Sequence, residues 1–269
     1  MIKEIFSFDE YEVFIKEISG DEEYYDPHFN HSPNNLYGIL QSEQEMAFVS
    51  EDDGRVNGLF GWMISPEDKN VELIIGFTRE ERAFEDMLTL IEQRFPGYQV
   101  DLVFSPKNQA IRNVAKRKQA DFEPEVQKMV HIRDVSDVDT SMIQEYAPKW
   151  RTQYCEIHPQ NVFWTAEKVI ETPERFRILL AMKEDTVVGY LDVTNCFEEN
   201  EIYGIYVKPE FRGLGYEKAL LVKAAEVNQA DDLMYLAEVE NEQEIAALME
   251  AGFEKRAGFN SVYCYYRTE

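Results

Sequence analysis

Long apolar runs are missing from this sequence. No stretch approaches the ~18 apolar residues that a helix needs to span a membrane. The first residues, Met1–Asp9, also lack the apolar core of a signal peptide. We therefore expect a cytoplasmic protein without a membrane partner.

Cysteine and histidine are also scarce. The sequence has three cysteines, Cys155, Cys196 and Cys264, and four histidines, and none of them shows the spacing of a metal site. His28 and His31 lie three residues apart, but the prolines on either side of them favour a surface loop. We expect reduced thiols and no bound metal.

Basic residues are few compared with acidic ones. The sequence holds 27 lysines and arginines against 52 aspartates and glutamates, a formal net charge of −25. Affinity for nucleic acids depends on neutralising their phosphates, so this excess argues against a nucleic-acid partner. A cationic small molecule or a basic peptide would be attracted. Acidity also keeps proteins soluble, and we leave both interpretations of the charge open.

What the sequence does contain is a repeated order of elements. Its 269 residues, 44% of them apolar, suffice for two folded domains. In the first half, periodicity and turn residues predict strands over 46–49, 57–65 and 71–77, a helix over 80–95, a strand over 98–104 and a helix over 108–119. The second half predicts helices over 138–155 and 165–170, strands over 176–182, 187–194 and 201–207, a helix from 216, a strand over 233–239 and a helix from 241.

This order recurs after about 130 residues, which is typical of a tandem repeat. We predict an α+β protein with a first domain over 1–134 and a second over 135–269. The segment 122–134 is predicted to be the last strand of the first domain.

A short glycine loop stands at the centre of the second half. The strand Ile202–Val207 is followed by Pro209, by Gly213 and Gly215, and then by a helix that begins near Tyr216. Glycines before a helix let backbone N–H groups converge on an anion, and the helix N-terminus adds partial positive charge. The spacing matches neither a nucleotide P-loop nor a dinucleotide-binding fingerprint, but a phosphate-bearing ligand is expected here.

These residues resemble a known pattern. The sequence Val207-x-Pro209-x-Phe211-Arg212-Gly213-x-Gly215 is similar to the acetyl-CoA loop of the GNAT N-acetyltransferase superfamily. A second segment, which begins at Asn241 and ends in Gly252-Phe253, resembles the family's next conserved stretch. The resemblance implies two tandem GNAT-like domains, each a mixed, mostly antiparallel sheet flanked by helices. It also implies acetyl-CoA as acyl donor and a small-molecule or peptide amine as acceptor. The net negative charge favours a cationic acceptor.

The resemblance also assigns roles to residues. The expected acetyl-CoA-binding residues are Ile205, Tyr206, Val207, Arg212, Gly213, Leu214, Gly215, Tyr216 and Asn241. Glu201 stands where many members carry a general base; alternatively, it belongs to a polar hairpin turn with Glu198 and Glu199. Trp150, Tyr154 and His158 fall where the acceptor-side helices of the family lie.

The sequence departs from the family pattern at three places, and the first two, Glu217 and Leu248, favour a different function. Glu217 replaces a small residue of the loop and points either to solvent or toward the cofactor. Leu248 stands where a proton-donating tyrosine is usual, and Tyr263, Tyr265 and Tyr266 are possible substitutes. In the first half, 79–82 replaces the glycine loop, so we interpret that domain as a degenerate copy, either a scaffold or a lid. The alternative function is a non-catalytic acyl-CoA-binding or regulatory protein; a homodimer also stays open.

Overall fold

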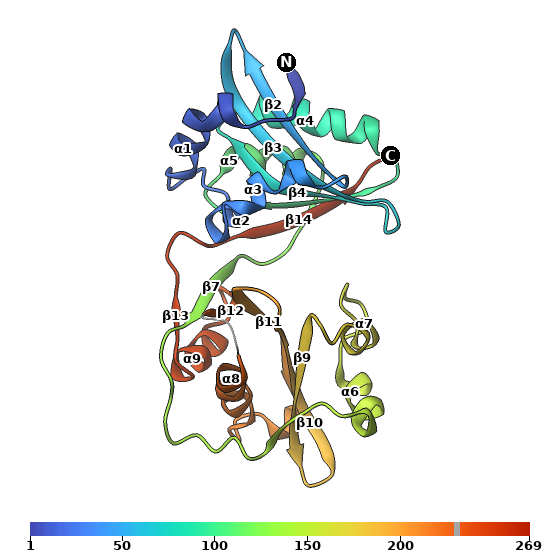
Figure 1. The fold of residues 1–269 in the computed structure, drawn as a ribbon, viewed down its shortest axis with the longest axis vertical. Coiled ribbons are helices and arrows are strands. Elements are labelled where there is room, and N and C mark those ends of the chain that lie inside the picture. Colours follow the sequence, from blue (N-terminus) through green and yellow to red (C-terminus); the bar gives the residue numbers. More distant parts are fainter. Residues whose placement is uncertain (229–231) are drawn as a thin grey trace. The chain divides into compact units, whose positions relative to one another are not determined.

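The chain forms two compact units. The computed structural model describes residues 1–228 and 232–269 (Figure 1). One unit consists of residues 1–126 and 257–269, and the other of residues 127–256. Within the described residues no helix is both long and apolar enough to cross a bilayer, and no three His, Cys, Asp or Glu side chains lie where they could share a metal ion.

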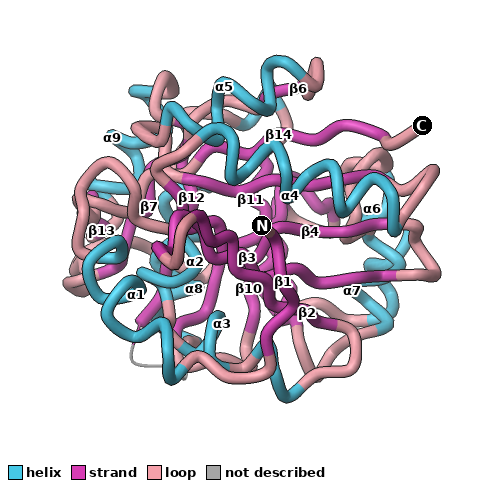
Figure 2. The backbone as a smooth tube through the Cα atoms, turned by 90° about the horizontal axis from the view of Figure 1, so that it is seen from above, coloured by secondary structure: helices cyan, strands magenta, loops and turns pink. Residues whose placement is uncertain are grey.

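The first unit is built on a seven-stranded sheet. Its strands lie in the order β1-β2-β3-β4-β5-β14-β6, and all neighbours whose register is defined are antiparallel except β4 and β5. Figure 2 shows the first two strands side by side. The strands are β1 (Ile2–Ile5), β2 (Glu45–Asp52), β3 (Arg55–Ser65), β4 (Asn70–Thr78), β5 (Gln99–Phe104), β6 (Asp121–Phe122) and β14 (Val262–Arg267). The helices are α1 (Glu12–Ser19), α2 (Pro27–His31), α3 (Asn34–Tyr37), α4 (Glu81–Arg94) and α5 (Gln109–Arg117). The predicted loop around the two histidines therefore contains the short helix α2, which Asp26 caps.

The second unit contains another seven-stranded sheet, in the order β13-β7-β12-β11-β10-β9-β8. Its strands are β7 (Val126–His131), β8 (Ile143–Glu145), β9 (Phe176–Lys183), β10 (Thr186–Thr194), β11 (Glu199–Val207), β12 (Asp232–Glu238) and β13 (Phe253–Lys255). Helices α8 (Tyr216–Val227) and α9 (Glu242–Glu250) lie on one side of this sheet, and α6 (Arg151–Ile157) and α7 (Ala166–Glu171) on the other (Figure 1). Apolar clusters fill both faces.

The predicted tandem repeat is confirmed in the sheets. In the first unit β4 pairs in parallel with β5 over four residues, Asn70–Leu73. In the second unit β11 pairs in parallel with β12 over four residues, Glu199–Ile202. Each then carries a register shift against its antiparallel neighbour, around Ile74 and around Tyr203. The two copies therefore share even their irregularities.

The two units exchange their last strands, which corrects the predicted domain boundary. β7 was expected to complete the first sheet, but it lies between β12 and β13 in the second, where Lys128 pairs with Glu199 at 2.6 Å. β14 lies between β5 and β6 of the first sheet and buries Val262 and Cys264 there. Elements that are neighbours in sequence usually pack together. Our prediction followed this rule and therefore assigned both β7 and β14 to the wrong sheet.

The predicted helix over 138–155 is also wrong. This segment contains the strand β8, a 3-10 turn at Pro148–Trp150, and only then the helix α6. Ala147, which precedes the proline, is extended with ψ near 152°. A residue before proline is disfavoured in the helical region, so the helix begins only after Pro148.

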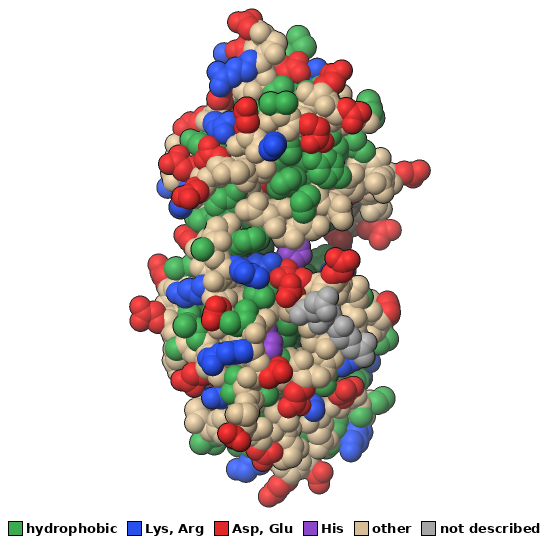
Figure 3. Space-filling model, turned by 60° about the vertical axis from the view of Figure 1, so that its left-hand side comes forward, with side chains coloured by type: hydrophobic (Ala, Val, Ile, Leu, Met, Phe, Trp, Pro, Cys, Tyr) green, Lys and Arg blue, Asp and Glu red, His purple; other side chains and the backbone are tan. Residues whose placement is uncertain are grey.

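Acidic side chains are scattered over the visible face in Figure 3 rather than gathered in one patch. This agrees with their even spread along the sequence. The net charge therefore does not by itself locate a binding site.

Candidate functional site

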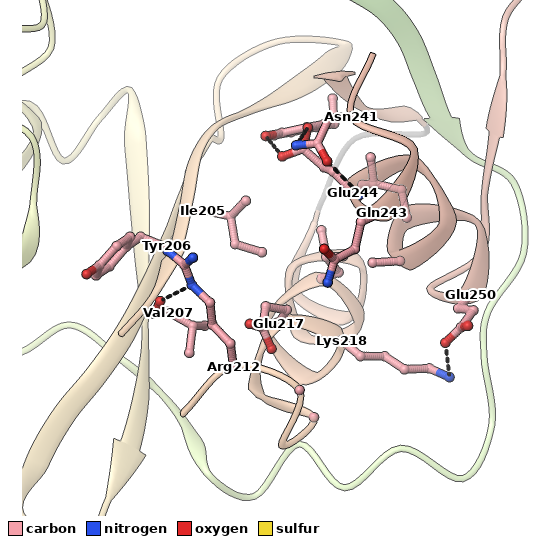
Figure 4. A pocket seen from close by; sticks show the side chains of 16 residues that line it. Ile205, Tyr206, Val207, Arg212, Glu217, Lys218, Asn241, Gln243, Glu244 and Glu250 are labelled. Atoms are coloured by element: carbon pink, nitrogen blue, oxygen red, sulfur yellow. Dashed lines mark hydrogen bonds and ion pairs between the residues drawn. The ribbon is translucent and has the colours of Figure 1, made fainter. Parts of the chain in front are cut away.

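The second sheet opens into a wedge between β11 and β12. Their parallel pairing ends at Ile202 and Tyr235, and the bulge at Tyr203 turns β11 away from its neighbour. A cavity of about 540 Å³ lies in this opening (Figure 4). It is lined by the end of β11, the glycine loop, the first turns of α8 and one face of α9.

The glycine loop presents unpaired backbone donors to this cavity. Gly213 and Gly215 have φ of 72° and 91°, a left-handed conformation that glycine adopts without strain. No atom lies within 4 Å of where their Cβ atoms would be. The first hydrogen bond of α8 runs from Ala219 N–H to Gly215 O, so the preceding N–H groups have no partner within the helix. This geometry fits a phosphate-bearing ligand.

Most of the predicted acetyl-CoA-binding residues line the cavity: Ile205, Tyr206, Val207, Arg212, Gly213, Gly215 and Asn241. Two do not. Leu214 is 64% exposed, and Tyr216 packs edge-on against Phe211. For all nine predicted residues, a role in acetyl-CoA binding stays a prediction.

Two hydrogen bonds hold the rim of the wedge in place. Arg212 Nε donates to Val207 O at 3.1 Å and ties the loop to the end of β11. Asn241 caps α9 through its side-chain oxygen, which accepts from Glu244 N–H at 3.1 Å. The loop and the start of α9 are therefore fixed on opposite sides of the opening.

Glu217 points into the cavity rather than to solvent. Its carboxylate lies between Arg212 and Gln243 in Figure 4. Glu244 and Glu250 also line the cavity, and Glu250 lies 3.9 Å from Lys218. Carboxylates therefore face the place where phosphates are expected.

Leu248, which stands where the resemblance leads us to expect a tyrosine, lines the cavity. The proposed substitutes, Tyr263, Tyr265 and Tyr266, belong to β14 in the sheet of the first unit. A different tyrosine is present. Tyr235 lines the cavity at the end of the strand pairing and donates to Glu244 Oε1 at 2.7 Å. Burial raises its pKa, which keeps the hydroxyl protonated.

The corresponding wedge of the first unit is closed by the chain's own side chains. Gly76 of β4 occupies the position of Ile205, and its N–H donates to the buried Asp26 Oδ2 at 2.8 Å. Asn108 Nδ2 donates to Thr78 O at 3.2 Å, across the same opening. Two backbone groups of β4, at the positions of Ile205 and Val207 in β11, are thus already hydrogen-bonded within the chain. That the first unit binds no cofactor stays a prediction.

Glu201 lies inside β11 rather than in the preceding turn, to which Glu198 belongs. Its N–H donates to Thr194 Oγ1 at 2.8 Å, and the residue is half-buried. Because Ile202 is buried on the α8 side, the strand's alternation turns Glu201 to the opposite face, where α6 and α7 lie. It does not line the 540 Å³ cavity.

A buried polar cluster on that opposite face joins Tyr154 and His158, which the sequence analysis singled out, to Asp192, which it missed. Asp192 of β10 accepts hydrogen bonds at Oδ2 from Tyr154 OH at 2.8 Å and from His158 Nε2 at 3.1 Å. Burial raises the pKa of Asp192, while the bond from His158 acts in the opposite direction. Burial acts to lower the pKa of His158, because it disfavours the charged imidazolium. The hydrogen bonds to Asp192 and Pro159 O have the larger effect, so the pKa of His158 is raised. The available signal was one carboxylate inside the otherwise apolar strand Val187–Val193.

The sequence and the fold both match known acetyltransferases. Residues 140–253 match the family model described as "Acetyltransferase (GNAT) family". No curated protein matches the sequence. A GCN5-related N-acetyltransferase from Sphaerobacter thermophilus has a similar structure, with a TM-score of 0.59 and 11% identity over 87% of this chain and 85% of that one.

Two further solved structures cover the whole chain. An acetyltransferase of the GNAT family from Colwellia psychrerythraea has a TM-score of 0.50 and 14% identity over 100% of both chains. A tandem GNAT protein from the clavulanic acid biosynthesis pathway has a TM-score of 0.52 and 10% identity over 100% of this chain and 98% of that one. At such identities the likeness concerns the fold. The GNAT family match covers residues 140–253, and the fold of the whole chain is similar to that of solved GNAT proteins.

Proposed function

We propose that the protein is an N-acetyltransferase that moves an acetyl group from acetyl-CoA to a primary amine of a small, cationic acceptor. The observation that carries this proposal is the open wedge beside β11, with the glycine loop at the N-terminus of α8 on its rim. The family match at 140–253 supports the same reaction class. Acetyl-CoA, when bound, supplies an activated acetyl thioester.

The chain's own residues would hold this donor mainly through backbone groups. The N–H groups at the start of α8 would bind the pyrophosphate, helped by the helix dipole. Beyond the bulge, β11 is not paired with β12, so the backbone of Ile205 and the N–H of Val207 are available to the pantetheine arm and the thioester carbonyl, while Val207 O accepts from Arg212. Donors fixed in this way stabilise negative charge that develops on the carbonyl oxygen.

Glu201 is our candidate for the general base. An ammonium must lose a proton before its nitrogen can attack, and a carboxylate can take it directly or through water. Glu201 lies two residues before the bulge, on the face of β11 away from α8. A base on that face would receive the proton on the acceptor side.

Replacing this carboxylate should slow turnover without weakening donor binding. We expect Glu201→Gln to lower kcat by ~10²-fold or more, since it removes proton acceptance and preserves shape. Acetyl-CoA affinity should stay near the wild-type value. The measurement is thiol release with a panel of amines across pH, beside calorimetry with acetyl-CoA. Glu198→Gln, in the exposed turn next to it, is the matched control. An unchanged pH–rate profile in Glu201→Gln would remove this residue from the mechanism.

Glu217 should weaken donor binding in the wild-type protein. Its carboxylate faces the cavity beside the amides expected to hold pyrophosphate, so Glu217→Ala should tighten CoA by about 1–2 kcal/mol at low salt. Screening should reduce the gain as ionic strength rises. Titrations at low and high salt measure both effects, and Glu210→Ala, exposed in the preceding turn, is the control. Equal affinities of wild type and Glu217→Ala at low salt would mean that the carboxylate turns away from the ligand.

A non-catalytic acyl-CoA-binding or regulatory role is the second candidate. Two observations favour it: Leu248 has no proton to donate to a leaving thiolate, and Glu217 opposes the phosphates. The two functions differ in one result. An enzyme releases CoA thiol when an amine is added, whereas a regulatory protein binds acetyl-CoA and returns it unchanged with every amine of the panel.

A further inference from the structure

The short helix α2 covers the free edge of β4 in the first unit (Figure 1). β4 pairs with β5 only as far as Leu73, and beyond that residue alternate positions turn their backbone groups to the open side of the strand. Three of these groups are hydrogen-bonded by side chains: Ile74 O by His28 Nδ1 at 2.9 Å, Gly76 N–H by Asp26 Oδ2 at 2.8 Å, and Thr78 O by Asn108 Nδ2 at 3.2 Å. Two of the three partners come from α2 and its cap.

The corresponding edge of the second unit is open. Ile205, which takes the place of Gly76, lines the 540 Å³ cavity there. An uncovered strand edge is a liability, because its backbone groups can pair with another chain. In the first unit α2 therefore covers an edge that the second unit leaves open.

Further hydrogen bonds hold α2 in this position. Asp26 is only 1% exposed, and its second oxygen, Oδ1, caps α2 by accepting from Phe29 N–H at 3.0 Å. On the other side, Tyr25 OH donates to Asn260 O at 2.9 Å, in the segment that precedes β14 in the same unit. Asn260 Nδ2 in turn donates to Glu125 Oε1 at 2.7 Å, which places one more carboxylate on that side.

A charged His28 offsets two carboxylates that are shielded from water. Its Nδ1 carries a proton, since Ile74 O can only accept. Burial raises the pKa of Asp26 and of Glu72 on β4, and the charge of His28 acts in the opposite direction on both. Asp101 of β5 adds a further negative charge, which also raises the pKa of Glu72. Acidic groups thus face His28 from its own segment and from the sheet.

We propose that α2 is a pH-sensitive latch over the edge of β4, closed while His28 is charged and loosened when His28 becomes neutral. A neutral ring can keep its hydrogen bond to Ile74 O but no longer offsets the carboxylates of Asp26 and Glu72. This inference concerns the first unit and does not rest on the proposed acetyl transfer.

The two carboxylates act in the same direction as His28. A carboxyl whose pKa is raised in the folded state stabilises that state at low pH, and the contribution is lost as the pH rises through the raised value. Histidine side chains change charge between about pH 5 and 8. The latch should therefore be firm at the acidic end of this range and loose at the basic end.

The test is residue-resolved hydrogen exchange of the full chain between about pH 5 and 8, corrected for the intrinsic effect of pH on exchange. The reporter is Gly76 N–H, which Asp26 protects in the closed latch. We expect its protection to fall by about tenfold or more as the pH rises, the effect of one lost charge interaction in a shielded site. The amide of Phe60, in the central strand β3, should stay protected.

Variants separate charge from hydrogen bonding. In His28→Asn the amide can still donate to Ile74 O but carries no charge, so Gly76 N–H should be weakly protected over the whole range, with most of the pH dependence lost. Glu72→Gln should act in the opposite way and keep protection high at the basic end, because it removes one of the offset carboxylates. His31→Asn, exposed in the same helix, is the matched control and should behave like the wild type.

Equal pH dependence of Gly76 exchange in wild type and His28→Asn would overturn the proposal. A parallel loss of protection at Gly76 and Phe60 would also overturn it, because the whole sheet would then open rather than α2 alone. If His28→Asn does not fold, Glu72→Gln decides, and a pH dependence equal to that of the wild type in this variant rejects the latch.

Discussion

A fragment of residues 127–256 should fold on its own, whereas a fragment cut at the repeat boundary, 135–269, should not. The first contains every strand of the second sheet, including β7. The second lacks β7, which lies between β12 and β13, and so loses the buried Met129 and the ion pair of Lys128 with Glu199. It also carries β14, whose apolar face has no sheet to join in this fragment.

The expected effect is large. When an interior strand is removed, the sheet loses hydrogen bonds and core contacts. The resulting loss of stability is comparable to the net stability of a whole domain, ~5–15 kcal/mol. An unpaired β14 further favours aggregation through its exposed strand edges. Circular dichroism, thermal melting and size-exclusion chromatography should show a cooperative monomeric fold for 127–256 and an unfolded or aggregated 135–269.

A third fragment, 127–269, is the control for the tail. It restores β7 but keeps β14, so it should fold and yet be more prone to aggregation than 127–256. Cooperative melting of 135–269 at the temperature of 127–256 would mean that β7 contributes little to the second sheet. The strand exchange would then be incidental to stability.

Local sequence patterns predicted most helices, strands and turns, because the start and end of such an element depend mainly on residues that are close in sequence. The hairpin at Asp53-Gly54 needs two left-handed residues, and both have positive φ. The cap of α9 by Asn241 and the start of α8 after Gly215 follow from the same kind of local signal. Proline gave a usable signal too, since Pro148 delays α6, but our prediction of one helix over 138–155 did not use it.

The parts that the sequence left open depend on contacts distant along the chain. A strand pattern does not say which sheet the strand joins, so the exchange of β7 and β14 was missed. The direction of Glu217 depends on how the loop meets α8 and α9. Asp192 lies within an apolar strand, and its importance follows only from Tyr154 and His158, which reach it from α6 and the residue after it.

Gly215→Glu should abolish acetyl-CoA binding. Gly215 begins α8 with φ of 91°, and a side chain there would add strain and place a carboxylate at the phosphate cradle. We expect at least a ~100-fold loss of affinity, the combined effect of steric exclusion and a like charge at a helix N-terminus. Gly54→Glu is the matched control, because Gly54 has φ of 77°, open space around its Cβ position and a place in the first unit.

Calorimetric titration of the full chain with acetyl-CoA tests the central claim most directly. The account predicts one site per chain in the wild type, the same site in Gly54→Glu and Glu81→Ala, and none in Gly215→Glu. Glu81 lies at the start of α4, where the first unit has no glycine loop, so its loss should not matter. Binding that survives Gly215→Glu and is weakened by Glu81→Ala would contradict the account and move the donor site to the first unit.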